Sequence, residues 1–157
     1  LAYPLEHIKM GTLPNAPLVT ALDLGTGVHP ANKSGYGQRA CRVALGTVYE
    51  KQVATCGPVY RSHKIDGSKI RISFDHLGQG LAFRHAKELK GFEIAGEDGI
   101  WQWAKAEIDG GSVLLSHPEV LKPKSVQYAF NRDPSYANLY NKDGLPALPF
   151  TSVDWEY

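Results

Sequence analysis

The spacing of apolar residues changes once along the chain. Val19–Leu24 is a short, mostly apolar run with β-branched residues, which predicts a strand covered on both faces. From Tyr36 the apolar positions recur at helical spacing, and the helix is expected to begin at an Asn32 N-cap and end near Glu50 or Lys51. A strand followed by such a helix is typical of the last βα unit of a doubly wound sheet. One unit cannot cover its own faces, so the remaining strands are expected to come from elsewhere.

Beyond residue 57 the apolar period shortens and strands predominate. Val59–Ile65 and Lys69–Phe74 are strand-like runs joined through Asp66-Gly67-Ser68, which is a hairpin signal. Turns with Gly, Asp or Pro separate the further expected strands: Leu81–Arg84, Phe92–Ala95, Ile100–Ile108, Val113–Ser116 and Val126–Phe130. This spacing predicts an antiparallel β-sandwich. The chain is therefore α/β plus all-β, with the βα unit in residues 1–56 and the sandwich, with a packed irregular tail, in residues 57–157.

Composition narrows the classes of function. With 43% apolar residues the chain can form a packed core, and a net charge of +1 without a basic block argues against nucleic acid as a partner. No apolar run reaches membrane-spanning length. Cys41 and Cys56 are too few for a metal site, and they are either buried free thiols or a disulfide, since Cys56 lies just past the helix that carries Cys41.

Two groups of apolar residues late in the chain raise separate questions. Trp101 and Trp103 share one face of an expected strand by their period of two. They either pack between the two sheets, which is the commoner use of such a pair, or present a stacking platform for a sugar. The tail from Asn131 to Tyr157 is too apolar to be free, so we expect it to pack back across the boundary between the two parts.

His29 is the strongest candidate for chemistry. It follows the predicted strand and the loop glycines Gly25 and Gly27, at the edge where open α/β sheets place their ligands. Its unperturbed pKa near neutrality suits a general base. The alternative is a histidine satisfied by backbone hydrogen bonds in a loop. The remaining histidines of the sandwich fall on separate strands or turns without metal-ligand spacing: His63, His76, His85 and His117.

The residues around His29 also resemble a known family. The strings Asp23-Leu24-Gly25, Val28-His29-Pro30-Ala31-Asn32-Lys33 and Gly37-Gln38-Arg39 resemble the histidine block of sialate O-acetylesterases, which are SGNH-type serine esterases. The resemblance covers most of the chain from about Leu18 onward. It continues through three later strings: Gly57–Tyr60, Leu89–Asp98 and Asn138–Ala147.

The resemblance implies that the chain is the C-terminal portion of such an esterase, with His29 as its catalytic histidine. Relatives place an acid two or three positions before this histidine, where this chain has Gly27 and Thr26. The nearest upstream acid is Asp23. It either orients the histidine or supports the loop instead, and a third alternative is that this chain has no orienting acid. No segment matches the family's serine and oxyanion-hole blocks. The nucleophile is therefore expected on an N-terminal portion or subunit of the same protein.

The implied reaction removes acetyl groups from O-acetylated sialic acids or other acetylated sugars, without a metal or organic cofactor. Relatives include secreted, lysosomal and bacterial exported proteins, so a secretory route is expected. In a secreted protein, Asn32-Lys33-Ser34 is a sequon that would accept a glycan at Asn32, although a glycan beside His29 would crowd the cleft. The alternative is a non-catalytic carbohydrate-binding or structural interaction module derived from this family, for which the missing serine block and Gly27 argue.

Overall fold

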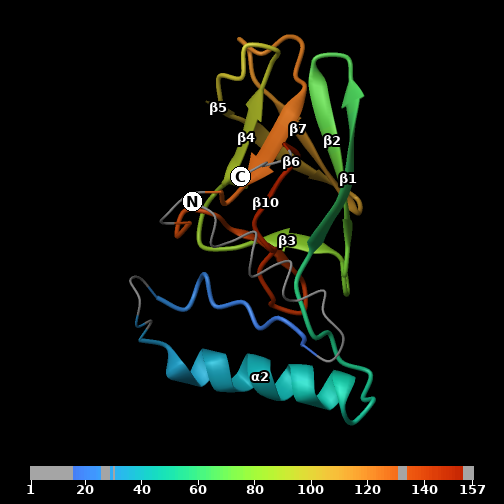
Figure 1. Cartoon of the computed structure of the whole chain (residues 1–157), viewed down its shortest axis with the longest axis vertical. Helices are drawn as coiled ribbons and strands as arrows, with labels where there is room; N and C mark the ends of the chain where they lie inside the picture. The colour runs from blue at the N-terminus through green and yellow to red at the C-terminus, as the bar shows by residue number, and fades with distance from the viewer. Residues whose placement is uncertain (1–15, 26–28, 30, 131–133, 154–157) are drawn as a thin grey trace.

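The computed structural model describes residues 16–25, 29, 31–130 and 134–153. Within this part of the chain a single α-helix, α2 (Lys33–Thr47), lies at one end of the molecule and β-strands form the rest (Figure 1). The strands are β1 (Val59–Asp66), β2 (Lys69–Asp75), β3 (Leu81–Phe83), β4 (Phe92–Ala95), β5 (Gln102–Trp103), β6 (Lys105–Asp109), β7 (Ser112–Ser116), β8 (Ser125–Tyr128), β9 (Leu139–Asn141) and β10 (Phe150–Thr151).

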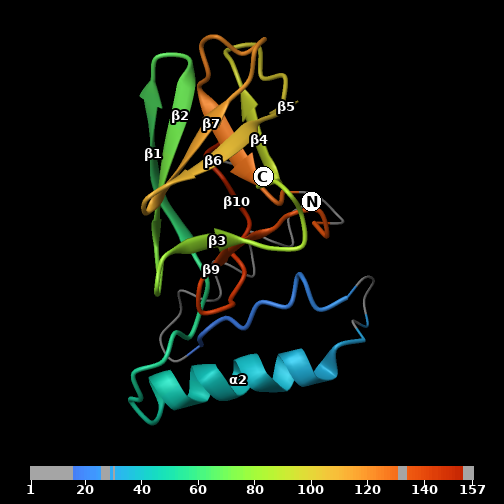
Figure 2. The same cartoon turned by 180° about the vertical axis from the view of Figure 1, so that it is seen from behind.

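The strands form two packed four-stranded sheets and a small third one. The order is β1-β2-β7-β6 in one sheet and β10-β8-β4-β5 in the other, while β3 pairs with β9. Every pair within these sheets is antiparallel. Seen from both sides, the β3–β9 pair lies between the two larger sheets and the helix (Figures 1 and 2). The expected antiparallel, β-rich architecture is confirmed.

Local turn chemistry explains the hairpin that the sequence predicts. Asp66 pairs with Lys69 across the two-residue turn, and Gly67 has a φ of +60° that glycine adopts without steric cost. The single strand expected over Ile100–Ile108 is instead divided at Ala104 into β5 and β6. These two strands belong to different sheets, because the chain crosses from one sheet to the other at that point.

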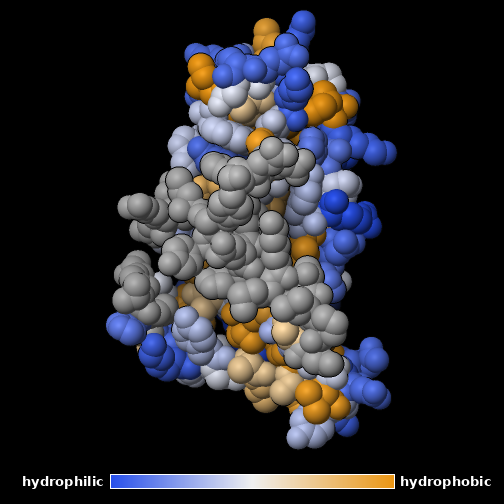
Figure 3. Space-filling model, in the orientation of Figure 1, coloured by the Kyte–Doolittle hydropathy of each residue, from blue (hydrophilic) through white to orange (hydrophobic). Residues whose placement is uncertain are grey.

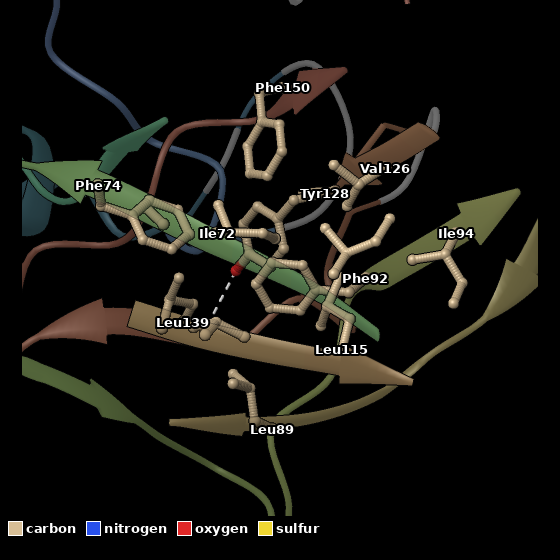
Figure 4. Packing of buried hydrophobic residues seen from close by; sticks show 14 of the residues in the cluster. Ile72, Phe74, Leu89, Phe92, Ile94, Leu115, Val126, Tyr128, Leu139 and Phe150 are labelled. Atoms are coloured by element: carbon tan, nitrogen blue, oxygen red, sulfur yellow. Dashed lines mark hydrogen bonds between the residues drawn. The ribbon is translucent and has the colours of Figure 1, made fainter. Parts of the chain in front are cut away.

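The core lies between the two large sheets (Figure 4). Alternate residues of β2 and β7 face alternate residues of β4 and β8, as the period of two requires. The phenolic oxygen of Tyr128 accepts a hydrogen bond of 2.9 Å from the backbone N–H of Leu139, so this buried hydroxyl is satisfied (Figure 4). The inward side chains that are fully buried include Ile70, Ile72, Val113, Leu115, Phe92, Ile94 and Val126.

The tail packs back, as expected, and it contributes two strands that the pattern did not predict. The Phe150 ring of β10 stacks on Tyr60 with centroids 4.4 Å apart, and it is 5% exposed. Just before β10, the backbone N–H of Leu148 donates a hydrogen bond to the carbonyl of Pro58. With three and two residues, β9 and β10 are too short to show a period.

The predicted strand Val19–Leu24 is wrong for this structure. Residues 16–20 have no regular secondary structure, a turn follows them, and Leu22 is 36% exposed. A strand needs a neighbour for its backbone hydrogen bonds, and within the described residues none pairs with this segment. By contrast, the Asn32 N-cap is confirmed: its Oδ1 accepts a 2.9 Å hydrogen bond from the Gly35 N–H. The helix ends at Thr47, about a turn earlier than expected.

Helix α2 is incompletely covered. Of its expected apolar stripe, Val43 is buried, whereas Val48, just past the helix, is 71% exposed and Tyr49 is 66% exposed. Figure 3 shows hydrophobic residues at the end of the molecule where the helix lies. Cys41 on this helix is exposed and Cys56 is half-buried. Both are free thiols, so the expectation of free cysteines is confirmed and that of their burial is not.

Candidate functional site

A backbone hydrogen bond joins the chain before His29 to the chain after it. The backbone N–H of Asn32 donates a 3.1 Å hydrogen bond to the carbonyl of Leu24, and Leu24 is only 6% exposed. We call Leu24 and Asn32 the neck. His29 itself is exposed to solvent. The same residue, Asn32, therefore closes the neck through its backbone and caps helix α2 through its side chain.

Asp23 fixes the neck to both parts of the molecule. Its two carboxylate oxygens accept hydrogen bonds of 2.7 Å each from the two terminal nitrogens of Arg39 on α2. Arg39 also donates to the carbonyl of Thr20 at 2.8 Å. From β9, 117 positions along the chain, the Tyr140 hydroxyl donates to Asp23 Oδ2 at 2.8 Å. A bidentate arginine–carboxylate pair is among the stronger polar contacts of proteins.

The electrostatics of this network follow from its burial. Burial alone would raise the pKa of the Asp23 carboxyl, but hydrogen bonds from Arg39 and Tyr140, with the Arg39 charge, hold it below its ordinary value. Burial, and then the neighbouring Asp23 carboxylate, raise the pKa of Tyr140. Asp23 is therefore ionised and Tyr140 is neutral at physiological pH. The Arg39 side chain is 11% exposed and that of Asp23 is 21% exposed.

The observed partners of Asp23 are Arg39 and Tyr140. Both of its oxygens are taken by Arg39 and Tyr140, and within the described residues no hydrogen bond joins His29 to Asp23 or to a serine. Thr26 and Gly27, the positions where an orienting acid was expected, lie outside the described residues. The catalytic role of His29 stays a prediction.

A cavity of about 470 Å³ opens beside the neck. Its walls come from four parts of the chain that are far apart in sequence: residues 22–25, 84–90, 128–129 with 134–140, and 146–147. Such a volume is typical of small-molecule sites. Asp23 and Gly25 line it, so the cavity adjoins the residues that precede His29. Alanine and proline side chains and three tyrosine rings supply apolar wall, and Arg84, His85 and Lys90 supply polar groups.

The two candidate sugar-contact tryptophans differ in their surroundings. Trp103 is 53% exposed, so its expected packing between the sheets is wrong. Its ring lies edge-on to Tyr136, with centroids 5.0 Å apart. Trp101 is half-buried and precedes β5. Trp103 lies outside the core because it pairs with Glu93 of β4, whose neighbours Phe92 and Ile94 point into the core on the opposite face of the sheet.

Sequence reasoning missed Tyr140 and Arg84. Tyr140 lies in one of the strings that carry the family resemblance, which was its only signal. Arg84 follows a short strand and has no motif around it. Among the described residues no group of histidine, cysteine and carboxylate side chains is arranged to hold a metal ion. None of the described helices is long and apolar enough to cross a membrane.

Comparison with solved structures relates the chain to carbohydrate esterases. One similar structure is a carbohydrate acetylesterase from Xanthomonas citri, with 36% sequence identity and a TM-score of 0.80. The match covers 85% of this chain and 31% of that enzyme, so the chain spans about a third of the length of its relative. No protein-family model and no curated protein sequence matches the chain.

Proposed function

We propose that this chain is the C-terminal part of a carbohydrate O-acetylesterase of the SGNH type, similar to sialate 9-O-acetylesterases. The observation that carries the proposal is the similarity to about a third of a carbohydrate acetylesterase, at 36% identity. In this proposal, residues 1–56 complete a hydrolase domain and residues 57–157 form the β-sandwich beside it. The serine nucleophile belongs to an N-terminal portion or subunit outside these 157 residues.

His29 acts as the base in this proposal. It takes the proton of the serine hydroxyl as the serine oxygen attacks the acetyl carbonyl, and it returns that proton to the sugar oxygen that leaves. Water then attacks the acyl-enzyme with His29 again as base, releasing acetate and free serine. Helix α2 is partly uncovered, and no described strand pairs with residues 16–25. Both observations are consistent with a larger hydrolase domain packed against this end. A secreted or lysosomal location, with O-acetylated sialic acid or another acetylated sugar as substrate, belongs to the same proposal.

The test is acetyl release by the intact protein carrying His29→Ala, with His63→Ala as matched control. His63 lies on β1 and hydrogen-bonds to the Tyr60 hydroxyl at 2.7 Å, away from the neck. We expect His29→Ala to lower kcat by about 10²- to 10⁴-fold with folding intact, and His63→Ala to leave it unchanged. Equal activity of the His29 variant and the wild type would refute the proposal. Acetylated sialic acid and a neutral acetylated sugar, assayed in parallel, would establish the substrate preference.

A second candidate function is a non-catalytic carbohydrate-binding or interaction module. It is favoured by the commitment of Asp23 to Arg39 and Tyr140, which leaves that carboxylate without a bond to His29, and by the exposure of Trp103. This function predicts glycan binding that persists in a protein without esterase activity. The activity assay of the intact protein separates the two candidates.

A further inference from the structure

Arg84 is held at the wall of the cavity in a defined position. Its guanidinium carbon lies 5.3 Å from the centroid of the Tyr140 ring, a cation–π contact. On its other side is Gly144, where a Cβ atom would lie 3.2 Å from an Arg84 nitrogen. The absence of a side chain at Gly144 therefore leaves room for the guanidinium. The backbone of Arg84 is tied to Asn138 by a 3.2 Å hydrogen bond.

His85 shares the same support and carries backbone strain. Its φ is +61°, in the left-handed region that non-glycine residues rarely occupy, and its ring lies edge-on to Tyr140 at 6.4 Å. Residues held in such conformations cluster at ligand sites. The strained turn lets both Arg84 and His85 lie against one tyrosine ring, whose hydroxyl is bound to Asp23.

Among the described residues, the donors of Arg84 have no carboxylate partner. Within the described part of the chain, no ion pair involves Arg84 or His85, whereas Lys90 pairs with Glu88 at 3.1 Å. The acid that lines the cavity, Asp23, is already neutralised by Arg39. A guanidinium presents planar donors that fit two oxygens at once. The cavity therefore offers paired hydrogen-bond donors to a ligand with adjacent oxygens.

Besides these polar donors, the cavity presents an apolar surface. Tyr136 lines the cavity and is backed by the edge-on ring of Trp103. Ala137, Pro134 and Ala147 extend the apolar wall. A pyranose ring has a C–H face that packs on such surfaces and a rim of adjacent oxygens that accept hydrogen bonds. The combination of an aromatic wall and an unpaired guanidinium matches that ligand.

We propose that this cavity is a sugar-binding subsite. Arg84 donates hydrogen bonds to adjacent hydroxyl or carboxylate oxygens of a pyranose ring, and the ring's C–H face packs on Tyr136. The choice of a carbohydrate ligand rests on the proposed function, but the subsite does not require His29 to be catalytic. Because Asp23 and Gly25 line the cavity, a glycan seated there lies beside the neck.

Binding of two matched probes to this chain tests the proposal. Methyl β-glucopyranoside and methyl β-glucuronide differ only in the carboxylate, and both are titrated in the millimolar range while backbone amide NMR shifts are recorded. Saturable shifts are expected at Arg84, Tyr136 and Ala137. Arg84→Ala should weaken binding about tenfold or more, the loss of a pair of hydrogen bonds. Arg84→Lys, which keeps the charge without the planar fork, should bind with intermediate affinity.

Arg61→Ala is the matched control, since Arg61 is an exposed arginine on β1 that pairs with Asp75. Melting temperatures establish that each variant is folded. Binding of the glucuronide alone would support the proposal with carboxylate as the recognised group, and binding of both would support hydroxyl recognition. No saturable shift with either probe, or equal affinity of Arg84→Ala and wild type, would overturn it. Probe binding by the His29→Ala variant separates this outcome from the fate of the esterase proposal.

Discussion

The β-sandwich and the helical end of this molecule are held together in different ways. The sandwich buries a continuous apolar core, with Ile70, Phe92 and Leu115 fully excluded from solvent. Among the described residues of 16–56, the buried apolar side chains are Leu24 and Val43. Directional polar contacts attach this end instead. Besides the Asp23 network, Arg42 donates to the Asp143 carbonyl at 2.9 Å, and the Asn141 side chain donates to the Cys56 carbonyl at 3.2 Å.

This difference separates two kinds of stability. Burial of apolar area is insensitive to pH and is spread over many residues. An ion pair with a bridging hydroxyl depends on a few atoms and on the ionisation of one carboxyl. The sandwich should therefore fold as a unit, while the placement of the neck depends on Asp23, Arg39 and Tyr140.

The largest expected effect is in the core. Phe92→Ala removes a fully buried ring that contacts Tyr128 and Phe150, and it should destabilise the protein by about 3–5 kcal/mol. Thermal unfolding followed by circular dichroism measures the shift. The control is Val48→Ala, at a position 71% exposed, which should change stability by about 0.5 kcal/mol or less. Similar losses for the two variants would contradict the assignment of the core.

A smaller effect is expected from Asp23→Asn, and it should depend on pH. The substitution weakens hydrogen bonds to a charged group, worth about 1.5–3 kcal/mol. The folded-state pKa of Asp23 lies below its ordinary value of 3.8. The stabilisation that the ionised carboxylate gives to the fold is therefore present above pH 3.8 and is lost as the pH falls through the folded-state pKa. The wild-type minus Asp23→Asn difference in melting temperature should thus be largest near neutrality and vanish in strong acid. A difference independent of pH would show that the charge does not stabilise the fold.

The smallest effect is expected from Tyr140→Phe, at about 1 kcal/mol. This variant removes the hydroxyl that donates to Asp23 and keeps the ring that supports Arg84 and His85. Hydrogen exchange at the Asn32 amide, which closes the neck, should become faster. The matched variant Tyr60→Phe removes a similar hydroxyl contact on β1 and should leave that amide unchanged. Equal exchange rates in the two variants would show that β9 does not position the neck.

Local patterns predicted most of the sandwich, because strand period and turn residues are written in adjacent positions. The β1–β2 hairpin, the Asn32 cap and most strand locations followed from such signals. Short strands such as β10 escaped, since two residues have no period. The segment 19–24 carries a strand pattern without a partner strand among the described residues, so sequence alone misassigned it.

The candidate site was predicted only in part, because the residues that meet there are far apart in the sequence. His29 and Asp23 stood out locally, but the partner that fixes Asp23 lies 117 positions away on β9. The cavity is likewise built from separated segments, and Arg84 belongs to it through its contact with Tyr140. No periodicity or motif in one stretch reports such a meeting of four segments.

The proposed function requires that this chain supply a histidine to a serine carried elsewhere in the same protein. The most direct test is labelling of the protein from its natural source with a fluorophosphonate, followed by intact mass and peptide mapping. The account predicts one adduct, on a serine in a glycine-flanked sequence outside these 157 residues, and its loss in His29→Ala. An adduct on a serine of this chain, or none on a stably folded chain of 17.2 kDa, would contradict it.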